Sequence, residues 1–123
     1  MFKINDSLIA ANLVDLSKKE QDDLIAIIRG KDKRQTRFAK EILLSRCRPM
    51  VEFVASMYKS SNIDFKKLVR CGEAALLKAT ETYNVNKRYR FVVYASWFVR
   101  TDIHKLLGLP ADPERFKFEI KKN

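Results

Sequence analysis

The stretch RYRFVVYASWFVR, residues 88–100, places five aromatic rings between arginines and contains no acidic residue. At about 100° per residue, Tyr94, Trp97 and Phe98 share one side of a helix, and Arg100 lies beside them. Such a surface suits single-stranded nucleic acid, because a base stacked on a ring contributes about 1–3 kcal/mol while arginines hold the phosphates. Tryptophan, tyrosine and arginine also dominate protein-binding hot spots. The rings alone therefore predict a nucleic-acid or a protein ligand almost equally.

The charge around the rings favours nucleic acid. Only Asp102 opposes the basic residues that flank them, which are Lys87, Arg88, Arg90, Arg100 and Lys105. The whole chain has Lys+Arg 25 against Asp+Glu 15, a formal charge of +10, which predicts a polyanionic partner, nucleic acid ahead of a membrane surface. The competing interpretation is a solvated basic face with every ring in the core. Core packing is the better interpretation for Phe91, Ala95 and Val99.

Other residue types argue against an enzyme. His104 is the only histidine, and no metal-ligand cluster surrounds it in sequence, so we expect no zinc site, catalytic triad or cofactor. Cys47 and Cys71 form no C-x-x-C pair and are expected to be reduced. Polar residues interrupt the first 21 residues, so the sequence predicts neither a signal peptide nor a membrane span. We therefore expect a cytoplasmic protein.

The elements that must position these residues are predicted to be helices. The chain has 123 residues with Gly 3 and Pro 3, which favours one all-α domain over a turn-rich β sandwich. Ser17 and Glu20 form a capping box that begins a helix ending near Gly30. From about Lys33 a longer pattern forms the main hydrophobic spine, in which Pro49 predicts a kink or a split. Its apolar residues are Phe38, Ile42, Met50, Val54, Met57 and Tyr58.

Two further helices complete the predicted domain. Asp64 caps one, in which Gly72 predicts a close helix crossing, because glycine costs about 1 kcal/mol in a helix interior. A polar loop over residues 84–88 leads into the aromatic helix, which ends at Gly108. We therefore expect an arm at 1–15, a compact multi-helix domain at 16–108 and a flexible or partner-bound tail at 109–123. The tail carries a strand-like alternation at Phe116, Phe118 and Ile120.

Several landmarks resemble region 2 of bacterial sigma-70-type sigma factors, without a gap from about residue 43 to 103. VEFVASMY at 51–58 is similar to the family's first conserved helix, and FKKLVRCG at 65–72 resembles its D-L-I-Q-E-G helix. The stretch from Tyr89 to Arg100 resembles the family's promoter-melting segment. Residues 16–32 are similar to the shorter helices of region 1.2 that precede it.

The resemblance implies an all-α, region-2-like domain that docks on the clamp coiled coil of core RNA polymerase and melts the promoter minus-ten element. Trp97 and Phe98 match the paired tryptophans at the upstream fork of the bubble, and Tyr94 matches the ring that stacks on a flipped adenine of the non-template strand. The implied DNA-binding residues are Arg88, Tyr89, Arg90, Phe91, Tyr94, Trp97, Phe98, Arg100, Thr101, His104 and Lys105. The implied polymerase-binding residues are Lys67, Leu68, Arg70, Cys71, Glu73 and Leu77. An anti-sigma protein is a further partner that the resemblance allows.

Departures from the family pattern keep a second function open. Lys67, Arg70 and Cys71 replace Asp, Gln and Glu, and such reversed charges are expected to weaken docking on the usual polymerase surface. Thr101 replaces a glutamine that reads the duplex, which predicts altered sequence preference. A chain of this length leaves no room for the domain that reads the minus-thirty-five element. The alternatives are a divergent sigma factor, a regulatory protein that keeps the sigma fold but not core binding, and a fragment of a longer sigma factor.

Overall fold

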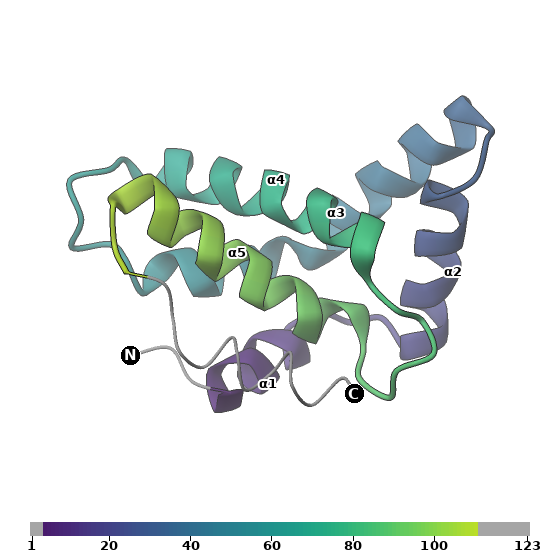
Figure 1. The fold of residues 1–123 in the computed structure, drawn as a ribbon, viewed down its shortest axis with the longest axis horizontal. Coiled ribbons are helices and arrows are strands. Elements are labelled where there is room, and N and C mark those ends of the chain that lie inside the picture. Colours follow the sequence, from purple (N-terminus) through teal and green to yellow (C-terminus); the bar gives the residue numbers. More distant parts are fainter. Residues whose placement is uncertain (1–3, 111–123) are drawn as a thin grey trace.

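Helix α5 (Phe91–Leu107) contacts the four other helices of the computed structural model (Figure 1). The structure describes residues 4–110, and their side chains from residue 8 onward. The other helices are α1 (Ile4–Asn12), α2 (Lys18–Ile28), α3 (Lys33–Ser56) and α4 (Phe65–Thr82). The described residues form no strand, so the predicted all-α fold class is confirmed. The strand-like alternation of the tail lies outside the described residues.

Local sequence signals place most helix ends correctly. Ser17 and Glu20 form the predicted capping box, in which each side chain accepts a hydrogen bond from the other residue's backbone N–H. The Asp64 side chain accepts a hydrogen bond from the backbone of Lys66 at the start of α4. Gly108 ends α5 with φ of 70°, a left-handed conformation that favours glycine.

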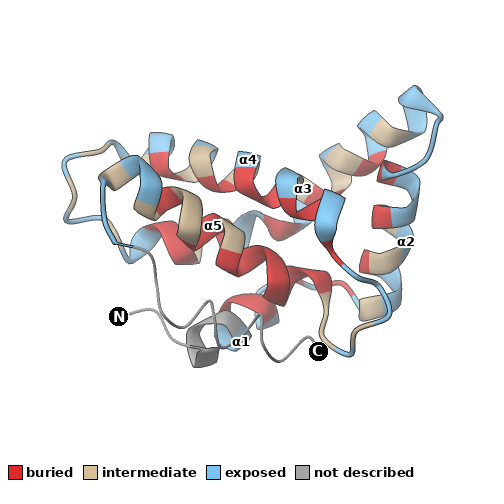
Figure 2. Ribbon diagram, in the orientation of Figure 1, coloured by how far each residue is buried: buried red, intermediate tan, exposed pale blue. Residues whose placement is uncertain are grey.

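The structure corrects two expectations for α3. Of the two outcomes expected at Pro49, a kink or a split, the split does not occur, because the helix continues from Lys33 to Ser56. A proline in a helix interior costs about 3 kcal/mol, and the burial of Cys47 and Met50 on either side offsets that cost. Phe38, predicted on the hydrophobic spine, is 65% exposed, because the first turns of α3 extend beyond α4 and α5 (Figures 1 and 2).

The residues predicted as an N-terminal arm include a packed helix. Helix α1 contacts both α3 and α5, and Ala10 and Ala11 at its end are buried. Val14 and Leu16, in the connection to α2, are buried as well. This packing adds to the cover over α5, whose first three turns are buried around nearly the whole circumference (Figure 2).

Gly72 lies where α4 closely approaches both α3 and α5. A Cβ atom at this position would lie 2.7 Å from Cγ1 of Val51 on α3 and 2.9 Å from Cγ1 of Val99 on α5. Both distances are shorter than a carbon–carbon contact allows, and valine side chains are too stiff to move away at low cost. The predicted close helix crossing is confirmed, and glycine is required for packing rather than for backbone conformation.

We predict that Gly72→Ala destabilises the protein by about 1 kcal/mol, because overpacking by about 1–3 kcal/mol exceeds a gain of about 1 kcal/mol in helix propensity. Denaturant unfolding measures the change. In a Val51→Ala background the same substitution is expected to cost less, since one of the two clashing methyl groups is gone. A Gly72→Ala protein more stable than the parent would contradict the proposed crossing.

Candidate nucleic-acid interface

Five aromatic rings meet where the loop between α4 and α5 leads into α5. Tyr83 is the centre of the cluster, with its ring centroid 5.4 Å from that of Phe91 and 5.7 Å from that of Tyr94. Tyr89, from the loop, lies nearly parallel to Tyr94, at an interplanar angle of 16° and a centroid separation of 6.3 Å. Phe98 continues the row at 5.0 Å from Tyr94. These separations fall within the usual range for paired aromatic rings, about 4.5–7 Å.

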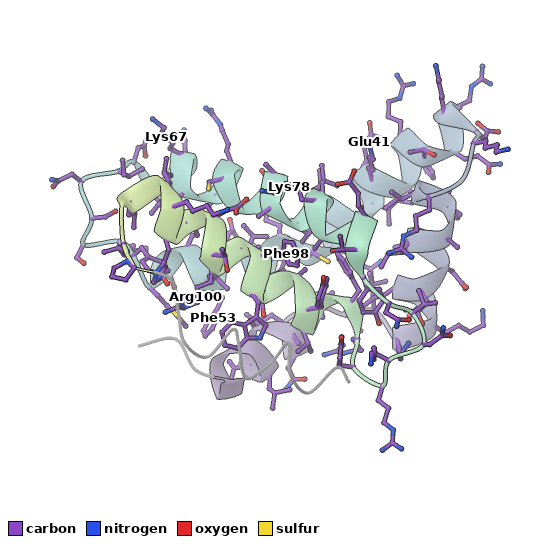
Figure 3. The ribbon with its side chains drawn as sticks, viewed as in Figure 1. Glu41, Phe53, Lys67, Lys78, Phe98 and Arg100 are labelled. Carbon is purple, nitrogen blue, oxygen red and sulfur yellow. The ribbon has the colours of Figure 1, made fainter. Side chains whose placement is uncertain are left out.

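The rings differ in how far solvent reaches them. Tyr89 and Phe98 are half-buried and form the accessible part of the cluster. Figure 3 shows Phe98 on α5. Tyr94 is 5% exposed and Trp97 only 2% exposed. Sequence periodicity correctly puts Tyr94, Trp97 and Phe98 on one side of α5, but that side is largely covered rather than open, since α5 is surrounded by other helices.

The predicted backbone-holding arginines also differ in environment. Arg88, in the loop, is exposed. Arg90 donates hydrogen bonds from Nη1 to the carbonyl oxygens of Val14 at 3.4 Å and Leu16 at 3.2 Å, so it fastens the N-terminal segment to the start of α5. Arg100 is 5% exposed. In this conformation Arg88 is the most exposed of the three arginines, Arg90 is half-buried and Arg100 is buried.

The remaining predicted DNA-binding residues lie further along α5. The side chain of Lys105 is exposed, and Thr101 is half-buried. His104 is half-buried and contacts α3's C-terminal end, with Nε2 2.7 Å from the Tyr58 hydroxyl and Nδ1 2.7 Å from the carbonyl oxygen of Pro110. These contacts give His104 a structural role that its sequence position did not indicate.

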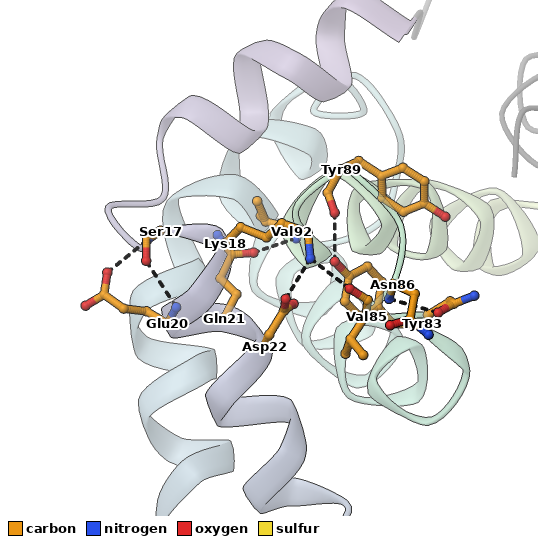
Figure 4. Close-up of polar contacts among 11 residues, drawn as sticks. Ser17, Lys18, Glu20, Gln21, Asp22, Tyr83, Val85, Asn86, Tyr89 and Val92 are labelled. Carbon is orange, nitrogen blue, oxygen red and sulfur yellow. Dashed lines mark hydrogen bonds and ion pairs between the residues drawn. The ribbon is translucent and has the colours of Figure 1, made fainter.

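Polar contacts hold the start of α5 and the loop before it against α2 (Figure 4). The amide nitrogen of the Gln21 side chain donates to the Leu16 carbonyl oxygen at 2.8 Å, and its Oε1 accepts from the Val92 backbone N–H at 3.0 Å. The Lys18 ammonium donates to the carbonyl oxygen of Val85 at 2.9 Å. Gln21 is fully buried, so its two hydrogen bonds are costly to lose. Sequence reasoning missed this residue, although a usable signal was present: Gln21 is spaced by four and seven residues from Ile25 and Ile28 and so shares their face of the helix.

The ring cluster is tied down in the same way. The Tyr83 hydroxyl donates to the carbonyl oxygen of Tyr89 at 2.7 Å, which fixes the loop beside the rings. Arg29, the C-cap residue of α2, donates hydrogen bonds to the carbonyl oxygens of Thr80 and Tyr83 at the end of α4. Burial raises the pKa of Tyr83 well above its usual value, helped by the nearby Asp22 carboxylate, and burial also raises the pKa of Tyr89. Both rings are therefore neutral at physiological pH.

The predicted polymerase-binding residues lie on α4. Lys67 and Arg70 are exposed, and Figure 3 shows Lys67 near the start of the helix. Cys71 and Leu77 are half-buried, whereas Leu68 is fully buried and packs in the core beneath this face. A pKa raised mainly by burial keeps the Cys71 thiol protonated.

A shallow hollow lies between this face and α3. Glu73, the remaining predicted residue, accepts a hydrogen bond from Arg48 Nη2 at 3.1 Å within an ion pair. The lining carries both signs of charge, with Glu52, Lys66 and Arg70 beside that pair. Among residues 4–110, no group of three or more metal-ligating side chains is present, and none of the helices there is long and apolar enough to cross a membrane.

Comparison with known proteins relates part of this chain to sigma factors. It is 29% identical over 83 residues to RNA polymerase sigma factor SigA of Lactococcus lactis subsp. cremoris, covering 68% of this chain and 22% of that protein. It is 30% identical over 72 residues to SigA of Microcystis aeruginosa, covering 58% and 17%. It is 27% identical over 106 residues to principal sigma factor HrdD of Streptomyces griseus, covering 86% and 30%.

These matches cover most of this chain but less than a third of each curated relative. No protein-family model matches the chain, and no solved structure matches it. The similarity is to sigma factors, at an identity of 27–30% over part of their length.

Because the chain has a single tryptophan, its fluorescence reports whether the ring face, the side of α5 that carries Tyr94, Trp97 and Phe98, is covered or open. We predict that Trp97 in the free protein emits at short wavelength and resists quenching by acrylamide, because solvent dipoles cannot relax around a ring that is 2% exposed. Steady-state fluorescence of the folded protein, with the urea-unfolded protein as the exposed reference, tests this. Emission already at the unfolded wavelength would mean that the ring face is open.

Proposed function

We propose that this chain acts as a sigma-like subunit that binds RNA polymerase and engages single-stranded promoter DNA at the minus-ten element. The similarity to sigma factors supports the general role in transcription initiation. The observation that carries the DNA-binding part is the contiguous row of rings from Tyr89 through Tyr94 to Phe98, beside the exposed Arg88. Rings for bases and a cation for phosphate are what a single strand requires.

The near-parallel pair of Tyr89 and Tyr94 is the proposed place for an extruded base. The two rings come from different elements, the loop and α5, so an outward movement of the loop would widen their separation of 6.3 Å and leave room for a third flat ring. Flipping a base costs a few kcal/mol of stacking and pairing, and rings return that energy only to the extruded base. Melting in this scheme proceeds by capture of flipped bases.

Burial divides the proposed DNA-binding residues into two groups. Arg88, Tyr89 and Phe98 are accessible and would make the first contacts. Trp97 and Arg100 are at most 5% exposed and would reach DNA only after their cover moves. The proposed role of Trp97 at the edge of the bubble therefore includes a conformational step, whose free-energy cost lowers the apparent affinity for DNA.

The exposed face of α4 supports a second function. Lys67 and Arg70 present positive charge where the resemblance implies acidic and amide contacts to polymerase. A basic partner surface would repel them, whereas an acidic one would attract them. The second proposal is a regulatory protein that keeps the sigma fold and uses this face for a different, acidic partner.

For DNA binding, we predict that Tyr89→Ala or Phe98→Ala lowers affinity for a single-stranded minus-ten oligonucleotide by about 5- to 150-fold, the equivalent of about 1–3 kcal/mol of base stacking. Tyr89→Ala keeps the backbone carbonyl that Tyr83 uses, so the fold should persist. Fluorescence anisotropy measures the affinity and circular dichroism checks the fold. Unchanged affinity in both folded variants would refute the ring site.

A control variant separates the contribution of Arg88 to DNA binding from that of the net charge. Arg88→Ala is expected to reduce the slope of log affinity against log salt concentration by about 0.7, the value for one phosphate contact on a single strand. Lys19→Ala removes the same charge from α2, where the side chain is 84% exposed, and should leave the slope unchanged. Equal effects of the two substitutions would mean that only net charge attracts DNA.

For polymerase binding, we predict that the purified protein co-elutes with core RNA polymerase of its own host. Lys67→Asp with Arg70→Gln restores the charges of the family pattern and should weaken the complex if the partner surface has become acidic. Lys19→Asp on α2 is the control for a change of charge elsewhere. If only the doubly substituted protein co-elutes, the second proposal holds, and if neither does, polymerase binding is refuted.

A further inference from the structure

The loop at residues 84–88 joins α4 to α5 and is held at both ends. Just before the loop, the carbonyl oxygen of Tyr83 accepts a hydrogen bond from Arg29. Just after the loop, Arg90 donates to two carbonyl oxygens of the N-terminal segment. Four of the five loop residues are exposed, so packing contributes little to the position of the loop between these two ends.

A side chain of α2 bonds to the middle of this loop. The ammonium of Lys18, on the first turn of α2, donates to the carbonyl oxygen of Val85 at 2.9 Å (Figure 4). The remaining hydrogen bonds of the loop join Asn84 to the backbone of the two residues that follow Val85, and so lie inside the loop. Among the residues that the structure describes, Lys18 is thus the one side chain outside the loop that bonds to it.

Asp22, one turn further along α2, holds the Lys18 ammonium in place. Its carboxylate accepts a hydrogen bond from Lys18 Nζ at 2.6 Å within an ion pair. The ammonium also lies 6.0 Å from the centroid of the Tyr83 ring, at the outer limit of a cation–π contact. The side chains of Lys18 and Asp22 are 31% and 23% exposed, so salt screens this pair less than a fully exposed one. These contacts direct one cation toward the loop.

A second pair on α2 has the same spacing but does not reach the loop. Lys19 and Asp23 form an ion pair at 2.8 Å, and their side chains are 84% and 59% exposed. Pairs that are so exposed contribute little to stability. The chain therefore contains a control of equal charge, one residue away from each member of the pair that holds the loop.

We propose that Lys18 and Asp22 form a latch that regulates the ring site by holding the loop against α2. This inference rests on the proposed DNA-binding function, in which the loop moves outward to admit a base between Tyr89 and Tyr94. Because α2 is itself packed on α3 and α5, a loop that leaves its place must break the bond from Lys18 to Val85. The latch lowers the fraction of molecules that can accept a base, and the apparent affinity falls in proportion. Lys18 is thus a positioning residue that opposes binding.

The latch can be tested without DNA. Lys18→Met removes the ammonium but keeps an unbranched side chain, and Lys19→Met is the control. NMR order parameters and relaxation dispersion together report motions from picoseconds to milliseconds. They should show greater mobility at residues 84–88 in Lys18→Met than in Lys19→Met, while circular dichroism shows that both variants are folded. Equal mobility of the loop in the two variants would overturn the proposal.

Affinity for a single-stranded minus-ten oligonucleotide, measured by fluorescence anisotropy, tests the regulatory effect. Both methionine variants lose one positive charge, so the difference between them isolates the latch. Lys18→Met should bind about 2- to 12-fold more tightly than Lys19→Met, the change in population that loss of one hydrogen bond produces. A purely structural role for Lys18 would not give tighter binding. Equal or weaker binding by Lys18→Met would therefore refute the latch.

The acidic residues give a second comparison at matched charge, which also serves if Lys18→Met does not fold. Asp22→Asn leaves the Lys18 ammonium without its carboxylate and should bind the oligonucleotide more tightly than Asp23→Asn. Equal binding by these two variants would remove Asp22 from the latch. If neither the parent nor any variant binds the oligonucleotide, the DNA-binding function is refuted, and the mobility of residues 84–88 alone decides whether the latch exists.

Discussion

The burial of the first three turns of α5 on nearly every side is the constraint on which the rest of the structure depends. Residues 91–99, rich in rings and β-branched side chains, offer no polar stripe to solvent, so this part of the helix must be surrounded. Each of the other helices contacts it, and Gly72 lets α4 and α3 approach it at the distance this requires. Hydrogen bonds from Gln21 and Arg90 then hold its first turn, satisfying the Val92 N–H and the carbonyl oxygen of Leu16.

This constraint also shapes the proposed nucleic-acid interface. The rings that would stabilise extruded bases are the same rings that pack the end of the domain, so function and stability draw on one set of side chains. Tyr89 and Phe98 remain partly accessible at the edge, whereas Trp97 is enclosed. In the proposed scheme, rings that pack inside the free protein keep a large apolar patch away from water, and DNA would replace those internal contacts on binding.

The surfaces proposed for DNA and for polymerase lie on different parts of the fold. The ring cluster occupies the loop and the start of α5, and the basic face lies on the first turns of α4 (Figure 1). Both carry exposed positive charge, in keeping with the formal charge of +10. They differ in the neighbouring chemistry, which is a row of rings in the first and a mixed-charge hollow in the second.

The sequence by itself determined α2, α4 and α5, because caps such as Ser17 and Asp64 and the stop at Gly108 act within a few residues, whereas α1 lies in residues that were expected to be an arm. It also determined that Gly72 marks a close crossing and that Tyr94, Trp97 and Phe98 share a side of α5. It could not determine which sides are covered, because burial depends on neighbours distant in the chain. Tertiary structure alone enclosed Trp97 and Arg100, carried α3 through Pro49 by packing on both sides, and left Phe38 exposed where α4 and α5 do not reach.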